Sequence, residues 1–124
     1  MRYRTVFMNS SRIAIATTDA VSVCDHLARS ASFLVFETEG CRVVSRTVRT
    51  RGTDACGNHR SFVDLLAGCR AVICGGIGAG AANALAAHGV ESVVLAGAMS
   101  VDAAIAGYLA GTLVTTEERV CLCG

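Results

Sequence analysis

The apolar residues in the first half of the chain follow strand patterns. In the segment 12–17, "RIAIAT", they alternate so that Ile13 and Ile15 share one face. The segment 33–37, "FLVFE", is a nearly continuous apolar run, which is typical of a strand buried on both faces. After a Glu-Gly turn, the segment 42–50 alternates again. This pattern predicts three consecutive strands in an antiparallel sheet.

The second half of the chain changes to helical spacing, interrupted by short apolar runs. Phe62, Leu65, Leu66 and Cys69 lie at i, i+3, i+4 and i+7, the spacing of one helix face. Glycines or a capping serine bound the later segments. The elements predicted in this half are a helix over 62–69, a strand over 71–74, a helix over 79–88, a strand over 91–96, and a helix that Ser100 caps and Gly111 ends.

The order of these elements predicts an α/β fold. Three antiparallel strands followed by βαβ units match a ribonuclease H-like fold, with a mixed five-stranded sheet flanked by helices. With 124 residues, the chain has the size of one domain. We expect residues 1–11 to form a short N-terminal extension, 12–114 a single cofactor-binding domain, and 115–124 a C-terminal tail that contains cysteines.

Charge and hydropathy narrow the classes of partner. A formal net charge of +1 gives no overall field that would attract nucleic acid or an anionic membrane. The segment 93–114 is long and apolar, but Asp102 at its centre would cost about 2.5–3.5 kcal/mol to insert into a bilayer. A strand, a glycine break and a capped helix explain this segment better. We therefore expect neither a membrane nor a nucleic-acid partner.

The cysteine content indicates the cellular compartment. The chain has seven cysteines, an odd number, and its first residues lack the apolar stretch of a secretory signal. We therefore expect reduced thiols and a cytoplasmic location. Cys69 and Cys74 fall within the predicted helix and strand, where we expect them to pack as small apolar residues of the core.

The glycine-rich stretch "VICGGIGAGAANAL" joins a predicted strand to a predicted helix. The spacing from Gly75 to Gly80 does not fit a dinucleotide fingerprint followed by a ribose-binding carboxylate, and no Lys-Ser/Thr pair completes a P-loop. A tight turn that lets the helix pack closely on the sheet explains the glycines. The helix N-terminus still offers an anion site, so a small nucleotide-binding enzyme built on this loop remains an alternative.

Three short stretches gather residues that bind iron or zinc. Imidazole and thiolate suit iron, zinc and iron–sulfur clusters, and an arginine suits an anionic cluster. None of the stretches alone has the spacing of a closed zinc site, although a zinc-stabilised protein-interaction module remains a second alternative. The candidates are Cys24, His26 and Arg29 after the first strand, Cys56 and His59 after the third, and Cys121 and Cys123 in the tail.

Three stretches together resemble a known family. They are "RIAIATTDAVSVCDHLARSASFLVFE", "CGGIGAGAANAL" and "VDAAIAGYLAGTL". They resemble the dinitrogenase iron–molybdenum cofactor biosynthesis family, which includes NifX/NafY-like proteins and the C-terminal domain of NifB-like proteins. The likeness covers residues 12–113. His26 matches the family's loop histidine and Arg29 the arginine of its motif, whereas the phenylalanine and glycine between them in the family are replaced here.

The resemblance implies a ribonuclease H-like carrier of iron–molybdenum cofactor or of its iron–sulfur precursors, with no catalytic residues. It implies reversible ligation of the cluster, a transiently bound cargo, in which His26 binds iron. Because a carrier must release its cargo, few ligands and open loops suit the task. The expected partners are metallocluster assembly proteins or a recipient apo-enzyme, and the chain is a possible homodimer. The cofactor-binding set is His26, Arg29, Cys24, Cys56, Gly76 and Gly78, and the metal ligands are drawn from His26, Cys56, His59, Cys121 and Cys123.

Overall fold

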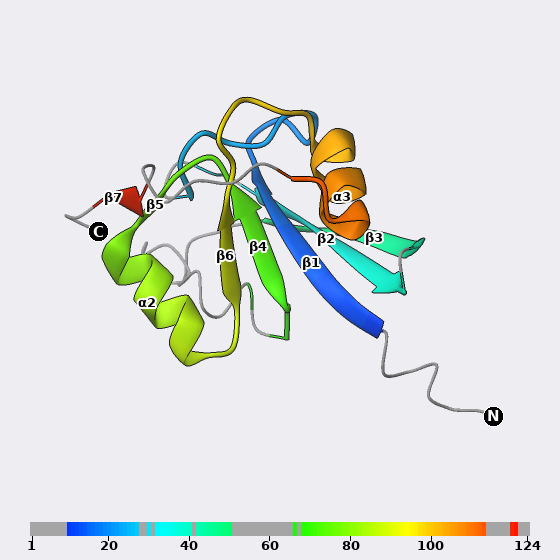
Figure 1. Ribbon diagram of the computed structural model, residues 1–124, viewed down its shortest axis with the longest axis horizontal. Coiled ribbons are helices and arrows are strands. Elements are labelled where there is room, and N and C mark those ends of the chain that lie inside the picture. The colour runs from blue at the N-terminus through cyan, green and yellow to red at the C-terminus, as the bar shows by residue number, and fades with distance from the viewer. Residues whose placement is uncertain are drawn as a thin grey trace.

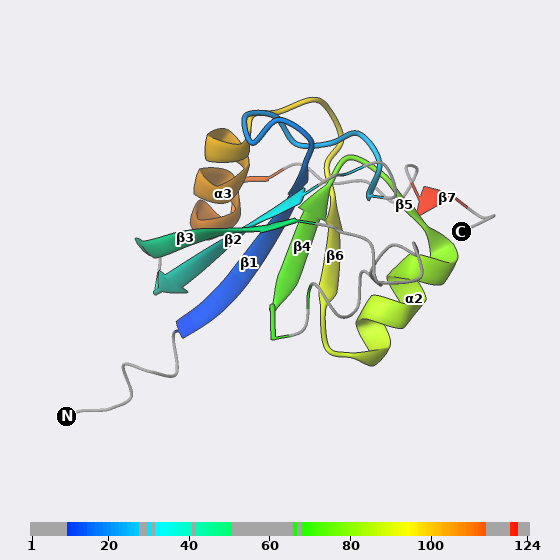
Figure 2. The same ribbon diagram turned by 180° about the vertical axis from the view of Figure 1, so that it is seen from behind.

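The computed structural model describes residues 10–27, 30, 32–40, 42–50, 66, 68–113 and 120–121. Figures 1 and 2 show a twisted sheet with helix α2 (Ala79–Ala87) and helix α3 (Val101–Ala110) on either side of it. None of the helices in these ranges is long and apolar enough to cross a membrane.

The main sheet has five strands in the order β3-β2-β1-β4-β6. The first three strands pair antiparallel with their neighbours, whereas β1 pairs parallel with β4, and β4 with β6. This arrangement confirms the predicted mixed sheet of three antiparallel strands followed by βαβ units. The five strands are β1 (Ser10–Thr17), β2 (Ser32–Glu39), β3 (Arg42–Thr50), β4 (Ala71–Cys74) and β6 (Glu91–Val94).

Each face of the sheet carries its own buried core, because side chains alternate between the two faces along every strand. On one face, Ala14, Val35 and Val72 pack with Leu85 of α2. The predicted core residues Cys69 and Cys74 are both buried here. On the other face, the strand residues pack against α3. The main members of this second core are Ile13, Ile15, Leu34, Ile73, Val101 and Ile105.

Helix α3 begins and ends where its sequence predicts. The Ser100 hydroxyl accepts a hydrogen bond from the Ala103 amide at 3.1 Å, which satisfies one of the unpaired amides of the first turn. Asp102 lies in that turn, where a carboxylate favours the positive end of the helix dipole. Gly111 adopts φ 74°, the left-handed conformation that ends many helices and that glycine adopts without strain.

Several boundaries differ from the prediction. Strand β1 begins at Ser10, inside the predicted N-terminal extension, and β6 ends at Val94, two residues early. Of the helix predicted over 62–69, Leu66 is helical, Gly68 already forms a turn with φ 84°, and Cys69 lies beyond the helix. The other members of that predicted helix lie outside the described residues.

A second, two-stranded sheet was not predicted from the sequence. Strand β5 (Ile77–Gly78) interrupts the glycine-rich stretch and pairs parallel with β7 (Val120–Cys121) of the C-terminal tail. The stretch predicted as a simple strand-to-helix turn therefore contains a short strand. The pairing also brings the end of the chain to the start of α2 (Figure 1).

Candidate functional site

The carboxyl ends of β1 and β4 lie side by side in the sheet, and the chain leaves them in opposite directions. After β1 it continues to β2 on one side, and after β4 it passes through α2 to β6 on the other. In open α/β sheets, such a switch point is the usual place for a ligand site. The loop after β1 and the glycine-rich stretch after β4, the two regions named by the sequence motifs, meet at this point.

The first part of the loop is held by a compact turn around Asp19. Its carboxylate accepts hydrogen bonds from the amides of Val21 and Ser22, each at 2.9 Å, which lower the pKa of the carboxyl. The Thr17 hydroxyl donates to the Ser22 carbonyl at 2.8 Å and accepts from the Ala20 amide. Ala20 has φ 63°, a left-handed conformation that this network holds in place.

The same loop is joined to the start of α3. The Val23 amide donates to the Met99 carbonyl at 3.0 Å, and the Val101 amide donates to the Val21 carbonyl at 2.8 Å. The second bond satisfies a first-turn amide of α3 that no helical carbonyl can reach. The loop is therefore fixed on one side by a helix N-terminus.

The second part of the loop lies directly on the glycine-rich stretch. The Gly75 amide donates to the Cys24 carbonyl at 2.8 Å, and the Leu27 amide donates to the Gly76 carbonyl at 2.7 Å. A Cβ atom at Gly75 would lie 2.8 Å from the Cα of Asp25 and 3.0 Å from the Cys24 carbonyl oxygen. Glycine is required here because two backbones approach too closely for any side chain.

Two candidate ligands lie in this segment, in different surroundings. The Cys24 side chain is 8% exposed, and its Sγ donates to the His26 carbonyl at 3.2 Å, so it packs into the core beneath the loop. His26 is half-buried and lies between Cys24 and Leu27, whose backbones are both bonded to the glycine-rich stretch. The structure thus holds the backbone on both sides of His26.

The other buried cysteines, Cys69 and Cys74, are held as protonated thiols of the core. Burial raises the pKa of Cys74 to about 12, despite a hydrogen bond from the Gly76 amide that lowers it. Burial also raises the pKa of Cys69, and nearby Arg49 and Arg12 only partly oppose this. Because the thiolate is the form that binds metal, these two side chains serve the core at neutral pH.

The tail supplies a further candidate at the same end of the sheet. The backbone of Cys121 pairs with Gly78, the residue that also precedes the first turn of α2. Gly78 has no side chain to cap the helix, and the first turn contains no acidic residue. Gly76, Gly78, Cys121 and the His26 segment thus belong to one region, although their sequence separation reaches 95 residues (121 − 26).

Four predicted site residues, Arg29, Cys56, His59 and Cys123, lie outside the described residues. Within the ranges that the structure describes, no group of three or more histidine, cysteine or acidic side chains is arranged to hold a metal ion. Of the predicted cofactor-binding site, the structure therefore describes the histidine segment, the glycines and the Cys121 backbone. The complete set of ligands stays a prediction.

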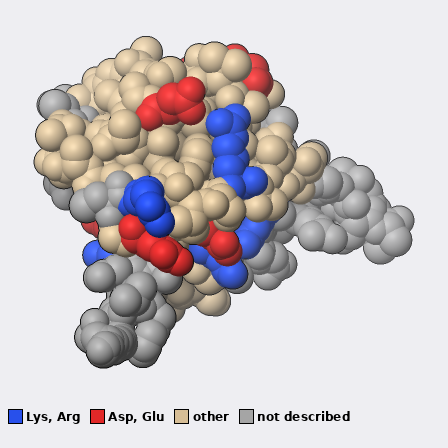
Figure 3. All heavy atoms as spheres, turned by 90° about the vertical axis from the view of Figure 1, so that its right-hand side faces the viewer, with Lys and Arg blue, Asp and Glu red and all other residues tan. Residues whose placement is uncertain are grey.

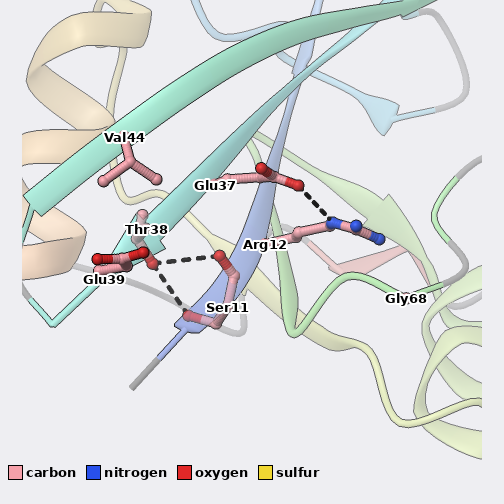
Figure 4. A pocket seen from close by; sticks show the side chains of 7 residues that line it. All are labelled: Ser11, Arg12, Glu37, Thr38, Glu39, Val44 and Gly68. Carbon is pink, nitrogen blue, oxygen red and sulfur yellow. Dashed lines mark hydrogen bonds and ion pairs between the residues drawn. The ribbon is translucent and has the colours of Figure 1, made fainter. Parts of the chain in front are cut away.

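A polar pocket of about 410 Å³ opens at the opposite end of the sheet, between the ends of β1 and β2 (Figure 4). Arg12 Nε lies 3.0 Å from Glu37 Oε1, and the Ser45 hydroxyl donates to Glu37 Oε2 at 3.0 Å. These two bonds lower the pKa of the Glu37 carboxyl. The neighbouring residues Ser11 and Thr38, which also line the pocket, have their hydroxyls hydrogen-bonded to each other at 3.0 Å.

This pocket was missed from the sequence. The available signal was the pair of opposite charges at the polar ends of the first two strands, since Arg12 and Glu37 are direct partners in the β1–β2 register. Its lining residues are Ser11, Arg12, Glu37, Thr38, Glu39, Val44 and Gly68.

Comparison with known families gives one match that covers most of the chain. Residues 9–111 match the family described as "Dinitrogenase iron-molybdenum cofactor". No curated protein matches the chain.

Solved structures show that the fold is shared. The crystal structure of the protein PH0822 has a TM-score of 0.72 and 21% identity over 87% of this chain and 98% of its own. A crystal structure of a candidate dinitrogenase from Methanocaldococcus jannaschii has a TM-score of 0.68 and 18% identity over 87% and 96%. An NMR structure of a candidate NifB protein of the DUF35 family from Thermotoga has a TM-score of 0.64 and 24% identity over 85% and 92%.

Proposed function

The chain belongs to the dinitrogenase iron–molybdenum cofactor family, and we propose that it is a non-catalytic carrier in the assembly of that cofactor. Family membership connects it with the biosynthesis of the cofactor. Our proposal is the narrower one: the chain binds an iron–sulfur cluster, the iron–molybdenum cofactor or a precursor, and passes this cargo on. The β3-β2-β1-β4-β6 strand order supports a ribonuclease H-like scaffold for the task.

The observation that carries the proposal is the seating of the His26 segment on the glycine-rich stretch. The bonds from Gly75 to Cys24 and from Leu27 to Gly76, at 2.8 and 2.7 Å, fix the backbone on both sides of the histidine. A neutral imidazole is a good ligand for iron, and a fixed backbone reduces the conformational entropy lost on binding. His26 is thus our first ligand for the cargo.

Charge and softer ligands complete the proposed site. An iron–sulfur cargo with its sulfides is anionic, and α2 begins at Ala79 with no acidic residue in its first turn, so its N-terminus favours negative charge. The Cys121 backbone is paired beside Gly78, which makes its thiolate a second ligand in our proposal. Cys24, Arg29, Cys56, His59 and Cys123 are the remaining candidates from the sequence.

A carrier suits a site with few protein ligands. A closed cage of four cysteines holds its metal as part of the fold, whereas cargo bound by one imidazole and one or two thiolates can be exchanged. We propose a cytoplasmic protein that meets an assembly protein as donor and an apo-enzyme as recipient.

The test is anaerobic reconstitution of the full chain with iron and sulfide, and separately with isolated iron–molybdenum cofactor. Bound iron, sulfide and molybdenum are measured together with the visible absorption spectrum. We expect stoichiometric uptake by the wild type and a loss of most of it in His26→Ala. The matched control is His88→Ala, because His88 is exposed at the end of α2 and its ring bonds only locally, to the Ala84 carbonyl.

The outcomes separate the proposals. Uptake that is equal in wild type and His26→Ala would move the site to Cys56, His59 and the tail. If the wild type takes up no cluster, the carrier proposal is wrong. Zinc that survives purification and is needed for folding would then favour the structural-zinc alternative, and saturable nucleotide binding would favour the enzyme alternative.

A further inference from the structure

Strand β3 is an exposed edge of the main sheet. Among the described residues it pairs with β2 alone, so one row of its backbone amides and carbonyls has no strand beside it. Eight of its nine residues are exposed, and Arg49 is half-buried. From Ser45 to Thr50 the pairing with β2 is regular, because the one irregularity lies nearer the start of the strand. Such an edge is a template for another strand.

The side chains of β3 are unusually apolar for an exposed strand. Of the four large apolar side chains that are exposed in the described part of the molecule, three lie on β3. They are Val43, Val44 and Val48, with exposures of 38, 45 and 55%. An edge strand with exposed valines presents both hydrogen-bonding groups and apolar surface to a partner.

An apolar groove of about 510 Å³ continues this surface onto α3. It is lined by Arg42 and Val43 of β3 and by Ile105, Ala106, Leu109 and Ala110 of α3. The groove could take the side chains on one face of an added strand, while the strand's backbone pairs with β3. The edge and the groove thus form one continuous surface.

The charge on this surface distinguishes between partners. Strand β3 carries Arg42, Arg46 and Arg49 and no acidic residue. Arg46 reaches across to α3, where it lies 3.8 Å from Asp102 and over the Phe36 ring. Figure 3 shows a column of arginine side chains, with acidic side chains above and below it, beside a broad uncharged area on the side of the molecule that lies to the right in Figure 1. Two β3 strands paired together would bring arginines near arginines, which is unfavourable.

We infer that the β3 edge and the β3–α3 groove bind an extended acidic segment of another protein. The segment would add as a strand beside β3, place apolar side chains in the groove and direct carboxylates toward Arg42. This inference does not depend on the cluster site, which lies at the carboxyl ends of β1 and β4. It concerns how the protein recognises a partner, whatever it carries.

The probe for this inference is a capped nine-residue peptide of alternating glutamate and valine, with a lysine–valine peptide as its counterpart. Binding to the full chain is measured by fluorescence anisotropy, and amide hydrogen exchange locates the contact. We expect the acidic peptide to bind and to slow exchange in β3. Arg42→Glu should weaken its binding about fivefold, the scale of one exposed ion pair, and should favour the lysine peptide instead.

Two matched variants of α3 test whether the groove takes part in binding. Ala106→Glu and Ala103→Glu each add one carboxylate to an exposed alanine of α3, but only Ala106 lines the groove. We expect Ala106→Glu to weaken peptide binding about tenfold more than Ala103→Glu, because it puts a charge into apolar surface. Circular dichroism spectra identical to the wild type confirm that both variants are folded.

Three results would overturn the inference. One is exchange in β3 that the acidic peptide leaves unchanged. Another is stronger binding of the lysine peptide by the wild type. The third is slow exchange in β3 without any peptide, together with a concentration-dependent dimer in sedimentation, which would assign the edge to a second copy of the chain.

Discussion

The two ends of the central sheet are built in opposite ways. At the carboxyl ends of β1 and β4, backbone meets backbone: Gly75 and Gly76 bond to the Cys24–Leu27 segment at 2.7–2.8 Å, and the side chains beneath are buried apolar residues and cysteines. At the other end, charged side chains surround an open pocket of about 410 Å³, where Arg12 and Glu37 are about half exposed.

The two ends differ in what holds them together. The pocket end is exposed to solvent. Water competes with the side-chain contacts there, so these contacts contribute little to the free energy of unfolding. The motif residues lie at the packed end, where a loop is fixed by bonds that water cannot easily compete for. Changes at the packed end should therefore have the larger effects.

The largest effect is expected for Gly75→Ala. The new Cβ would lie 2.8 Å from the Asp25 Cα, so the loop and the strand end must separate. We expect the free energy of unfolding to fall by about 1–3 kcal/mol, the usual cost of overpacking. Urea denaturation followed by circular dichroism measures this change.

The control for that variant is Gly97→Ala. A Cβ there would meet nothing within 4 Å, and Gly97 is not in the left-handed region. Its stability should stay at or slightly above the wild-type value, since alanine reduces the entropy of the unfolded chain. Equal losses in both variants would contradict the close packing at Gly75.

The second-largest effect is expected from Cys74, whose burial reports how well the packed end excludes water. Its pKa is raised from 9.0 to about 12 by burial, so the folded protein keeps this proton when the unfolded chain has lost it. Below pH 9, Cys74 is protonated in both the folded and the unfolded chain, so it does not make the free energy of unfolding depend on pH. Between about pH 9 and 12 the free energy of unfolding should fall by up to about 1.4 kcal/mol per pH unit.

The variant Cys74→Ala isolates this contribution. Denaturation of wild type and variant across pH 8–11 gives two curves, and their difference reports Cys74 alone. The difference should shrink as pH rises, because the variant lacks the buried thiol. A constant difference would mean that water reaches this end of the sheet and that the contrast between the ends is overstated.

Much of the fold could be predicted because its signals are local. The bounds of β3 follow from alternating residues and those of β4 from a short apolar run, and the ends of α3 follow from Ser100 and Gly111. Each of these signals acts within a few residues of where it stands in the chain. The predicted ends of β1 and β6 were less accurate. Polar residues such as Ser10 belong to a strand only because they pair with a neighbouring strand.

The parts that could not be predicted depend on distant contacts. Strands β5 and β7 have two residues each and lie more than 40 residues apart, so neither has a pattern of its own. The family resemblance identified His26 and the glycines, but their contact through Leu27 and Gly76 depends on the neighbouring positions of β1 and β4. Likewise, the 8% exposure of Cys24, a candidate ligand from the sequence, depends on how the loop packs on the sheet.

A smaller effect is expected at Ser100, which links α3 to the loop of the packed end. Its hydroxyl caps the helix, and the next amide, from Val101, donates to the Val21 carbonyl of the loop. Ser100→Ala should lower the free energy of unfolding by about 1 kcal/mol, the usual cost of a lost cap. Thermal denaturation measures the change.

The matched control for Ser100→Ala is the variant Ser92→Ala. Its hydroxyl oxygen is buried and has no hydrogen-bond partner among the residues that the structure describes, so it is desolvated without compensation. Ser92→Ala should therefore leave stability unchanged or raise it, in contrast to Ser100→Ala. If both variants lose the same amount, the cap at Ser100 contributes nothing specific.

The smallest effect is expected at the pocket end, from Glu37→Gln. The lost ion pair with Arg12 is exposed to water and screened by salt, so the melting temperature at neutral pH should not change measurably. The pKa of Glu37 is lowered in the folded protein, so its stabilising contribution exists above the ordinary pKa and disappears as the pH falls through the folded value. Any small difference from the wild type should thus vanish in acid. Glu37→Gln should also take up cluster as the wild type does in the reconstitution assay, because Glu37 and His26 lie at opposite ends of the sheet. A variant that keeps its stability but loses its cargo would move the functional site to the pocket and reverse the roles of the two ends.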